Sequence, residues 1–443
     1  MIENGEGRRT EAPPVLERVG IHGFKAVLEA DVEIRPLTIL AGANSSGKSS
    51  LMQPLLLMKQ TLEAGYDPGA LLLDGPNATF THPDEILHRR KGVAADAFRV
   101  TTAMSVGGTV TTEFRRDKAG LTLVATVFDV RSAQARLTDE MSDSEIRAVL
   151  PKPPPRIRKL LDAASLEVVR YRCFHAVAFH PASAEQMPLL YPLFEPAALA
   201  AEGLRSLLHV PGLRGNPERT YHLTSAGPGF VGTFVPYVAS VLLQWQADKD
   251  PRCAAVSAHM GSMGLTCRVR AKQRDATRVE LRVGRTCRAL PGADSDLVNI
   301  ADVGFGVSQV LPVVVALVAA DPGQAVYIEQ PEIHLHPRAQ LAMAAILAEA
   351  AKRGVRVVVE THSDLLLLAV QTLVAEGKLD PALVKLHWFA RDDDGVTTVT
   401  SRDLDADGSY GDWPEDFTTV DLRAQNAYLD ASEQHLFGAL HAR

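Results

Sequence analysis

The chain is 443 residues long, which exceeds one ordinary domain and predicts two or three lobes. Its composition, 46% hydrophobic and 22% charged, is that of a soluble globular protein, and its net charge of −7 excludes a nucleic-acid binder that is basic over its whole surface. Its apolar runs fall short of the ~20 residues of a membrane span, and its polar start lacks the apolar segment of a signal peptide, so we expect a cytoplasmic protein without a membrane partner.

The first elements predicted along the chain are strands. Residues 1–14 are expected to form a flexible tail, followed by alternating runs at 16–21 and 30–34 and a short apolar run at 37–41. Two antiparallel strands before the third indicate a β-subdomain beside the site that follows. We expect residues 15–130 to form the N-terminal half of a nucleotide-binding core, with a mainly antiparallel sheet over 68–130.

The stretch from Gly42 to Ser49 reads GANSSGKS and fits the phosphate-loop pattern G-x-x-x-x-G-K-[ST]. A strand precedes it and a Leu- and Met-rich helix is expected from Ser50 to Gln60, the context that a phosphate cradle needs. Lys48 is expected to reach the β- and γ-phosphates, and the Ser49 hydroxyl to ligate Mg²⁺. The other candidate nucleotide-binding residues in this loop are Gly42, Asn44, Ser45, Ser46, Gly47 and Ser50.

The sequence changes in character over residues 131–263, which we expect to form an insertion lobe with a proline-dense segment at 151–155 and helices near 193–208. Strand-like alternation returns at 264–290 and predicts a hairpin whose outer face is rich in arginine. A solvated hairpin face is the favoured interpretation, and a contact with the phosphate backbone of DNA or RNA is the alternative. The four cysteines form no C-x-x-C pair, so we expect free thiols.

Residues 300–362 alternate between helix and strand, as in a parallel α/β sheet. The apolar strand 325–329 ends in Glu329, which is placed to hold Mg²⁺ through water. Glu332 lies just beyond the strand and is the candidate base for the water that attacks the γ-phosphate. After a helix over 334–351, the strand 355–359 leads to His362, which is a candidate contact to the γ-phosphate.

A second glycine-bearing helix start lies between these halves. Gly304, Gly306 and Ser308 precede or open an apolar helix, and such an N-terminus is suited to an anion. One nucleotide does not need two phosphate cradles. We therefore expect these three residues to contact the nucleotide held by a second copy of the chain, in a homodimer or a higher even oligomer.

The order of these motifs resembles the ABC-type ATPases of the SMC/RecF/RecN branch. The resemblance rests on GFK at 23–25, GFGVSQVLP at 304–312, EQPEIHLHP at 329–337 and ETHS at 360–363. More narrowly, the chain resembles stand-alone ATPases of phage-defence operons, such as PtuA subunits and the ATPase halves of OLD-type nucleases. The resemblance covers roughly residues 15–125 and 290–420. Two weaker matches are PGLRGNP at 211–217 and DWPEDF at 412–417.

This resemblance implies an α/β fold with an ABC-type P-loop NTPase core, an antiparallel β-subdomain and a mixed α/β insertion lobe. It implies ATP and Mg²⁺ as cofactors, Glu332 as catalytic base, His362 as switch histidine, and a C-terminal half of the core at 264–400 followed by an extension at 401–443. The serine usual in the signature is absent from its expected place, and no Q-loop glutamine is identified. The TOPRIM nuclease domain of OLD-type enzymes is not recognised after His362, so we expect no nuclease activity in this chain.

The leading hypothesis is an ATP-binding and hydrolysing dimeric switch that controls a separately encoded effector, expected to be a nuclease. The alternative from another class is a RecF-like repair ATPase that binds DNA through the basic hairpin and the basic cluster at 147–159. A transporter motor and a scaffold that hardly hydrolyses ATP are two further readings. The sequence does not name the effector or its trigger.

Overall fold

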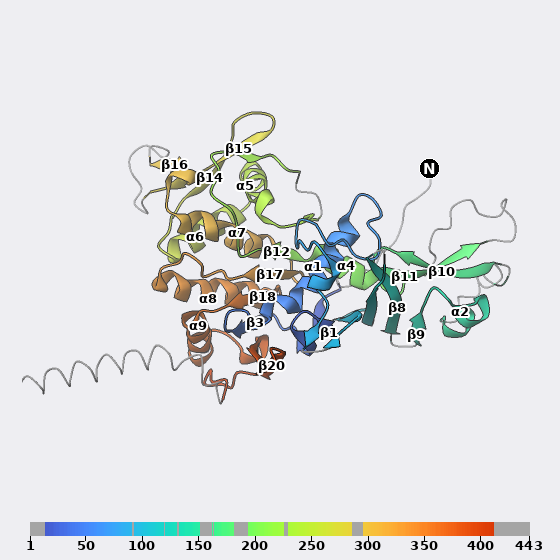
Figure 1. The fold of residues 1–443 in the computed structure, drawn as a ribbon. Coiled ribbons are helices and arrows are strands. Elements are labelled where there is room, and N and C mark those ends of the chain that lie inside the picture. Colours follow the sequence, from blue (N-terminus) through green and yellow to red (C-terminus); the bar gives the residue numbers. More distant parts are fainter. Residues whose placement is uncertain are drawn as a thin grey trace, which may run out of the picture.

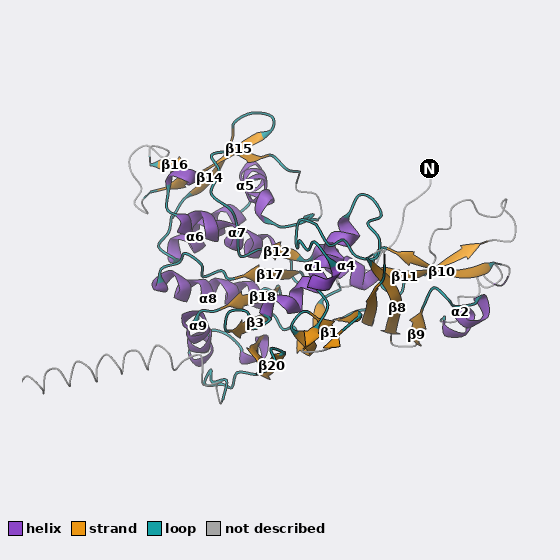
Figure 2. Cartoon of the chain, in the orientation of Figure 1, coloured by secondary structure: helices purple, strands orange, loops and turns teal. Residues whose placement is uncertain are grey.

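The structure is a computed structural model that describes residues 14–90, 93–118, 120–130, 133–150, 162, 164–180, 194–225, 229–285 and 296–411. Strands dominate one side of the molecule and helices the other (Figure 2). Residues 1–13 of the tail predicted at 1–14, the proline-dense segment at 151–155 and residues 412–443 of the extension predicted at 401–443 lie outside the described residues.

An antiparallel six-stranded sheet forms the first layer, as predicted. Its strand order is β2-β1-β6-β7-β8-β9. The bounds are β1 Leu16–Phe24, β2 Val27–Glu33, β6 Ala97–Met104, β7 Gly108–Arg116, β8 Leu121–Val130 and β9 Ala133–Leu137. Buried positions such as Val19 and Ile21 alternate with more exposed ones along β1, because successive side chains of a strand point to opposite faces.

A second six-stranded sheet carries the nucleotide motifs, in the order β12-β17-β18-β3-β19-β20. Its first five strands are parallel and only β20 is antiparallel to its neighbour. The bounds are β3 Leu37–Gly42, β12 Leu208–Val210, β17 Ala325–Glu329, β18 Arg356–Thr361, β19 Val384–Arg391 and β20 Thr397–Arg402. Because β18 lies between β3 and β17, the phosphate loop, the acidic residues and His362 follow neighbouring strands at one edge of the sheet.

Helices cover both faces of this parallel sheet (Figure 1). One core joins alternate strand residues such as Ile39 and Val357 to α5–α9, and the other joins Leu40 and Val358 to α1, α4 and the antiparallel sheet. The helices are α1 Lys48–Glu63, α2 Asp143–Val149, α4 Ala198–Ser206, α5 Val238–Ala247, α6 Arg252–Ser262, α7 Phe305–Ala319, α8 Pro337–Lys352 and α9 Asp364–Ala375, with 3₁₀ turns η1 Pro83–Glu85, η2 Val235–Tyr237, η3 Ile300–Asp302 and η4 Pro381–Leu383. The predicted mixed α/β fold with a parallel core sheet and an antiparallel β-subdomain is confirmed.

The stretch 131–263, predicted as one insertion lobe, is distributed over several parts of the molecule. Its strand β9 completes the antiparallel sheet, β12 is the edge strand of the nucleotide sheet, and α5 and α6 pack against α7. In the described part of this stretch, α2 and the hairpin of β10 and β11 lie far from the parallel sheet and pack against β9 and β8 of the antiparallel sheet (Figure 1). The remaining strands are β4 Arg89–Arg90, β5 Val93–Ala94, β10 Ser165–Tyr171, β11 Phe174–His180, β13 Tyr221–His222, β14 Val269–Gln273, β15 Arg278–Gly284 and β16 Leu297–Asn299.

The structure bears on three local predictions, which concern the start of α8, the cysteines and membrane-spanning helices. The helix expected from His334 starts only at Pro337, because His336 accepts a hydrogen bond from the Arg338 amide and caps it. Cys267 is disulfide-bonded, which corrects the expectation of free thiols at that position, whereas Cys173 and Cys253 are free. Within the described part of the chain, no helix combines the length and the apolar character needed to cross a bilayer.

Candidate nucleotide-binding site

The phosphate loop connects β3 to α1, and both of its invariant glycines are required by close contacts. Gly42 has φ 146° and Gly47 has φ 102°, in the left-handed region that favours glycine. A Cβ at Gly42 would come within 2.2 Å of the Phe389 carbonyl oxygen, and one at Gly47 within 2.3 Å of Thr397 Oγ1. Thr397 also donates to the Ser46 carbonyl at 2.9 Å, so the β19–β20 hairpin supports the loop from outside.

The Lys48 ammonium is hydrogen-bonded to its own phosphate loop. Its Nζ donates to the carbonyl oxygens of Gly42 at 3.0 Å and Ala43 at 2.7 Å, and to Ser46 Oγ at 3.4 Å. Burial lowers the pKa of Lys48 to about 8, although Glu360 and Glu332 act in the opposite direction. A buried ammonium whose partners are neutral oxygens is suited to bind an anion, because phosphate oxygens offer stronger charge-assisted hydrogen bonds.

A pocket of about 450 Å³ opens beside this loop. It brings together six predicted residues, which are Asn44, Ser45, Gly47, Lys48, Ser49 and Ser50 of the loop, with His362 from the end of β18. It also includes residues that the sequence did not single out: Lys25, Gln53, Gln330, Glu360 and Arg391. Of these, Gln330 has φ 43°, a left-handed conformation that is uncommon outside glycine and often marks a functional turn.

Two carboxylates end the neighbouring strands β17 and β18, and they have different partners. Glu329 accepts from His209 Nε2 at 3.1 Å and from the Gly212 amide at 3.0 Å. Glu360 accepts from Ser49 Oγ at 2.9 Å and also from the Tyr327 hydroxyl. The predicted metal residue Glu329 is therefore bonded to the loop after β12, while Glu360 is bonded to the hydroxyl of the phosphate loop.

The protonation of these two carboxylates differs accordingly. Burial alone would raise the pKa of Glu329, but the hydrogen bond and charge of His209 bring that pKa below its usual value. Burial raises the pKa of Glu360 to about 7, against the lowering effect of its hydrogen bonds to Tyr327 and Ser49. Glu360 follows a β-branched strand and opens the ETHS match at 360–363, and these are the signals that could have identified it.

Glu332, the predicted catalytic base, is hydrogen-bonded to the segment that carries the predicted switch histidine. Its Oε1 accepts from Thr361 Oγ1 and from the His362 amide, both at 2.8 Å. Its Oε2 is buried and has no hydrogen-bond partner among the described residues. Burial lowers the pKa of His362 and the charge of Lys48 lowers it further, so this imidazole is neutral at pH 7.

The predicted signature residues stand apart from this pocket. Gly304 caps α7, and the Ser308 hydroxyl donates to the Phe305 carbonyl at 3.0 Å within the same helix. The side chain of Phe305 is 51% exposed next to these residues. Gly304, Gly306 and Ser308 are not among the residues that line the pocket at Lys48. Their predicted contact with the nucleotide of a second copy stays a prediction.

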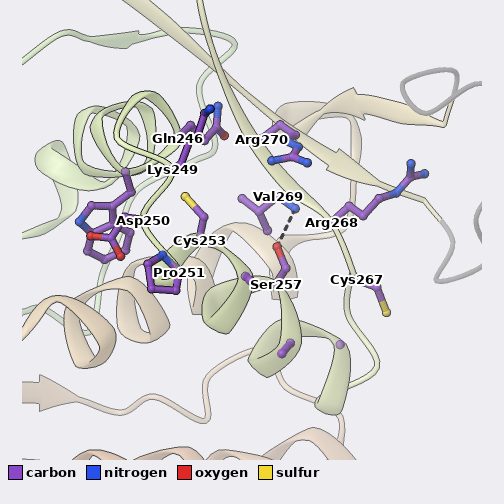
Figure 3. Close-up of a pocket in the computed structure, with 14 residues that line it drawn as sticks. Gln246, Lys249, Asp250, Pro251, Cys253, Ser257, Cys267, Arg268, Val269 and Arg270 are labelled. Atoms are coloured by element: carbon purple, nitrogen blue, oxygen red, sulfur yellow. Dashed lines mark hydrogen bonds between the residues drawn. The ribbon is translucent and has the colours of Figure 1, made fainter.

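The basic hairpin predicted at 264–290 is the pair β14 and β15. Some of its arginines are paired within the chain, since Arg268 pairs with Asp296 at 2.7 Å and Arg274 pairs with Glu280 at 3.3 Å. Beside it, a cavity of about 830 Å³ opens between the end of α5, α6 and β14. Figure 3 shows Lys249, Arg268 and Arg270 among its lining residues, so part of the basic character is preserved there.

We predict that Glu360→Gln stabilises the protein at alkaline but not at acidic pH. The folded pKa of Glu360 is about 7 against 4.5 for an ordinary exposed glutamate, so its contribution to stability is complete below pH 4.5 and lost as the pH rises through 7. In buffer without Mg²⁺, the variant should gain about 2–3 kcal/mol at pH 8.5 and almost nothing at pH 4.5. Denaturant unfolding midpoints of both proteins at the two pH values measure this, and a pH-independent difference would contradict it.

Solved structures similar to this chain include heads of SMC proteins. An SMC head bound to the C-winged helix domain of ScpA is 14% identical, with a TM-score of 0.46 over 88% of this chain and 98% of that chain. The SMC head domain from Thermotoga maritima is 11% identical, with a TM-score of 0.37 over 87% and 98%. A head with coiled coil and joint derived from Pyrococcus yayanosii is 10% identical, with a TM-score of 0.45 over 89% and 98%.

A comparison with curated proteins gives no match. A family match, in contrast, spans residues 37–369, from the strand before the phosphate loop to the helix after His362. This range contains the phosphate loop, Glu329, Glu332 and His362, which the fold gathers at one sheet edge. By this match over most of its length, the chain belongs to the family described as "AAA domain, putative AbiEii toxin, Type IV TA system".

Proposed function

We propose that this chain is an ATP-binding and ATP-hydrolysing switch subunit that acts as a dimer and controls a separately encoded effector, as the PtuA and OLD-type ATPases that it resembles suggest. The main support is the pocket of about 450 Å³ that combines Lys48, Ser49 and His362. The signature residues of the same chain face elsewhere. A second copy would complete the site by bringing its own signature helix to the exposed nucleotide.

In this proposal each residue has a separate task. Lys48 exchanges its carbonyl partners for the phosphates, and neutral His362 holds the γ-phosphate by a hydrogen bond. Glu332 Oε2, a buried acceptor without a partner, takes the proton of the attacking water. Ser49 and a carboxylate at the end of β17 or β18 hold Mg²⁺, which neutralises charge on the phosphates when it is bound. Nucleotide turnover would open and close the dimer and so transmit the signal to the effector.

Gly304→Asp tests the dimer without touching the pocket. A Cβ at Gly304 meets no atom within 4 Å, and this glycine has no left-handed φ, so the single chain should fold and bind ATP as before. We expect the wild type to double its mass with ATP and Mg²⁺. Gly304→Asp should stay monomeric, because a carboxylate there repels the phosphates of the nucleotide bound to the second copy. Light scattering after chromatography measures the mass.

Gly65→Asp is the matched control, because a Cβ at this exposed glycine also meets open space. It should dimerise like the wild type. A wild type that binds ATP and keeps one mass would contradict the dimeric switch, and equal dimerisation of Gly304→Asp would contradict the role of the signature helix. An effector that is active alone and indifferent to this chain would contradict control of that effector.

The cavity in Figure 3 favours one second candidate function, a contact to the backbone of DNA or RNA. In β14 and β15, Arg270 lies directly opposite Arg282, whose charge is balanced by Glu280 at 3.8 Å, whereas Arg270 forms no ion pair with the described residues. Lys249 adds a third cation to the same region. Such a site would belong to a RecF-like repair ATPase.

If this second function holds, a combined Lys249→Glu and Arg270→Glu variant should lose at least about tenfold in DNA affinity and show a shallower salt dependence. Fluorescence anisotropy with labelled duplex at several salt concentrations, with ATP present, measures both quantities. Arg402→Glu on the exposed part of β20 carries half that charge change away from the cavity and should have little effect. No binding by the wild type, or binding that salt does not weaken, would contradict this function.

A further inference from the structure

The carboxylates Glu329 and Glu360 lie side by side. In the parallel pair of β17 and β18 they are register partners, and register partners in a parallel sheet point to the same face. Glu360 is also the register partner of Leu40 in β3, the strand that leads into the phosphate loop. Either carboxylate could by its position serve a metal next to Ser49, so their bonding partners decide between them.

Glu329 uses both of its oxygens within the protein. His209 and the Gly212 amide each occupy one oxygen, and Arg214 donates to the Glu329 main-chain carbonyl at 2.6 Å. His209 is buried, stacks on Tyr327 with ring centroids 5.4 Å apart, and places its Nδ1 3.2 Å from Asn77 Oδ1. Withdrawing Glu329 toward a metal would leave the buried donors of this network without an acceptor, which is costly.

Arg214 extends the same network to the signature helix. Its guanidinium donates to the Gln309 carbonyl at 3.2 Å, and the Gln309 side chain donates to the Gly215 carbonyl at 2.7 Å. The position of Glu329 thus fastens the end of β17 to the loop after β12 and to α7. This is the geometry of a structural carboxylate, which orients its neighbours and is not itself a metal ligand.

Glu360 has the opposite arrangement. One oxygen accepts from the Tyr327 hydroxyl, which fixes the carboxylate, and the other accepts from Ser49 Oγ at 2.9 Å. Glu360 lines the pocket together with Ser49 and Lys48. When a serine hydroxyl gives a lone pair to a metal, its proton needs an acceptor, and the observed Ser49–Glu360 hydrogen bond provides that acceptor.

We propose that Glu360, rather than Glu329, is the carboxylate that supports the Mg²⁺ of the bound nucleotide, acting with Ser49, and that Tyr327 is its positioning residue. This inference rests on the proposed ATP binding. Among the described residues there is no group of three or more His, Cys, Asp or Glu that could hold a metal by itself. Mg²⁺ is commonly held by one or two carboxylates together with phosphate oxygens.

The test is the affinity of the nucleotide complex for Mn²⁺, which replaces Mg²⁺ and is visible by electron paramagnetic resonance. The protein is saturated with a slowly hydrolysed ATP analogue, and the signal of free Mn²⁺ is followed during titration. Glu360→Gln keeps the size of the side chain but removes its charge and replaces one acceptor oxygen by an amide donor, and should weaken Mn²⁺ binding by about 10–100-fold. Glu329→Gln should weaken it by less than about threefold, because this side chain does not leave its network.

Three controls keep the outcomes separate. Glu376→Gln changes one exposed charge at the end of α9 and should bind Mn²⁺ like the wild type. Analogue binding in EDTA and circular dichroism show that each variant folds and still takes nucleotide. Tyr327→Phe should weaken Mn²⁺ binding less than Glu360→Gln, because it removes only the group that holds the carboxylate.

A loss in Glu360→Gln that is at least about three times that in Glu329→Gln supports the assignment. An equal loss in both variants, or a larger loss in Glu329→Gln, overturns it and returns the metal to the residue expected from the sequence. If the wild type itself binds no nucleotide, the proposed function fails. If the wild type binds nucleotide and Mn²⁺, and the Glu360→Gln variant binds Mn²⁺ with the same affinity, only this inference fails.

Discussion

Lys48→Ala is expected to lower the affinity for ATP at least about 100-fold, because the variant loses the one ammonium that the phosphate loop directs into the pocket. In the structure this group donates to the carbonyl oxygens of Gly42 and Ala43 and is only 4% exposed. The same loss should abolish the mass increase with ATP and Mg²⁺. Isothermal titration calorimetry gives the affinity directly.

The fold should tolerate this change. Burial already disfavours the charged form of Lys48, as its pKa of about 8 shows, so removing the charge does not remove a stabilising ion pair. The unfolding midpoint at pH 7 should therefore stay close to that of the wild type. Lys378→Ala, which removes an exposed and surface-paired lysine, is the matched control. Unchanged ATP binding in a folded Lys48→Ala variant would mean that the loop is not the nucleotide site.

Lys59→Ala is expected to destabilise the protein by about 3–5 kcal/mol, the largest structural effect that we predict. Lys59 lies on α1, behind the phosphate loop, and its side chain is 0% exposed. Its Nζ pairs with Glu63 and donates to the carbonyl oxygens of Arg205 at 3.0 Å and Phe230 at 3.1 Å. Within the described part of the chain, the variant would leave the Glu63 carboxylate buried with the Gly232 amide as its one remaining partner.

A double variant separates the charge from the shape of this site. Lys59→Met with Glu63→Gln removes both charges and keeps the volume, so it should recover most of the stability that Lys59→Ala loses. Chemical unfolding followed by circular dichroism gives the midpoints of the single and double variants. Less than about 1 kcal/mol lost in Lys59→Ala would show that water or another group replaces the ammonium. Because α1 begins at Lys48, weaker ATP binding should accompany the loss of stability.

Lys48→Ala and Lys59→Ala test the two ends of the same helix, α1. Its N-terminus carries the loop that we propose to bind phosphate, and its C-terminal half anchors the helix to the segments around Arg205 and Gly232. Gln60 contributes to the same anchoring, since its amide bonds the main chain of Leu72 and Ala78. These bonds direct the Gln60 side chain to the main chain of a neighbouring segment, which agrees with a position too early for a Q-loop.

The sequence by itself determined the elements whose signals are local. The phosphate loop, its strand and its helix are contiguous, so their pattern contains nearly all of the information that shapes them. The alternation at 16–21 and the β-branched strand before His362 are likewise confirmed, with boundaries that shift by a few residues. These elements depend on hydrogen bonds and side-chain periodicity within short segments.

Only the tertiary structure decided which of these residues meet. Ser49 and Glu360 are 311 positions apart, and His209 and Glu329 are 120 apart, so no local pattern relates them. The use of β12 as a sheet edge within a supposed insertion lobe is of the same kind. Local physics sets strands and loops, but the strand order 12-17-18-3 decides which carboxylate faces the phosphate loop. That order arises from burying two hydrophobic cores at once, which a linear pattern does not encode.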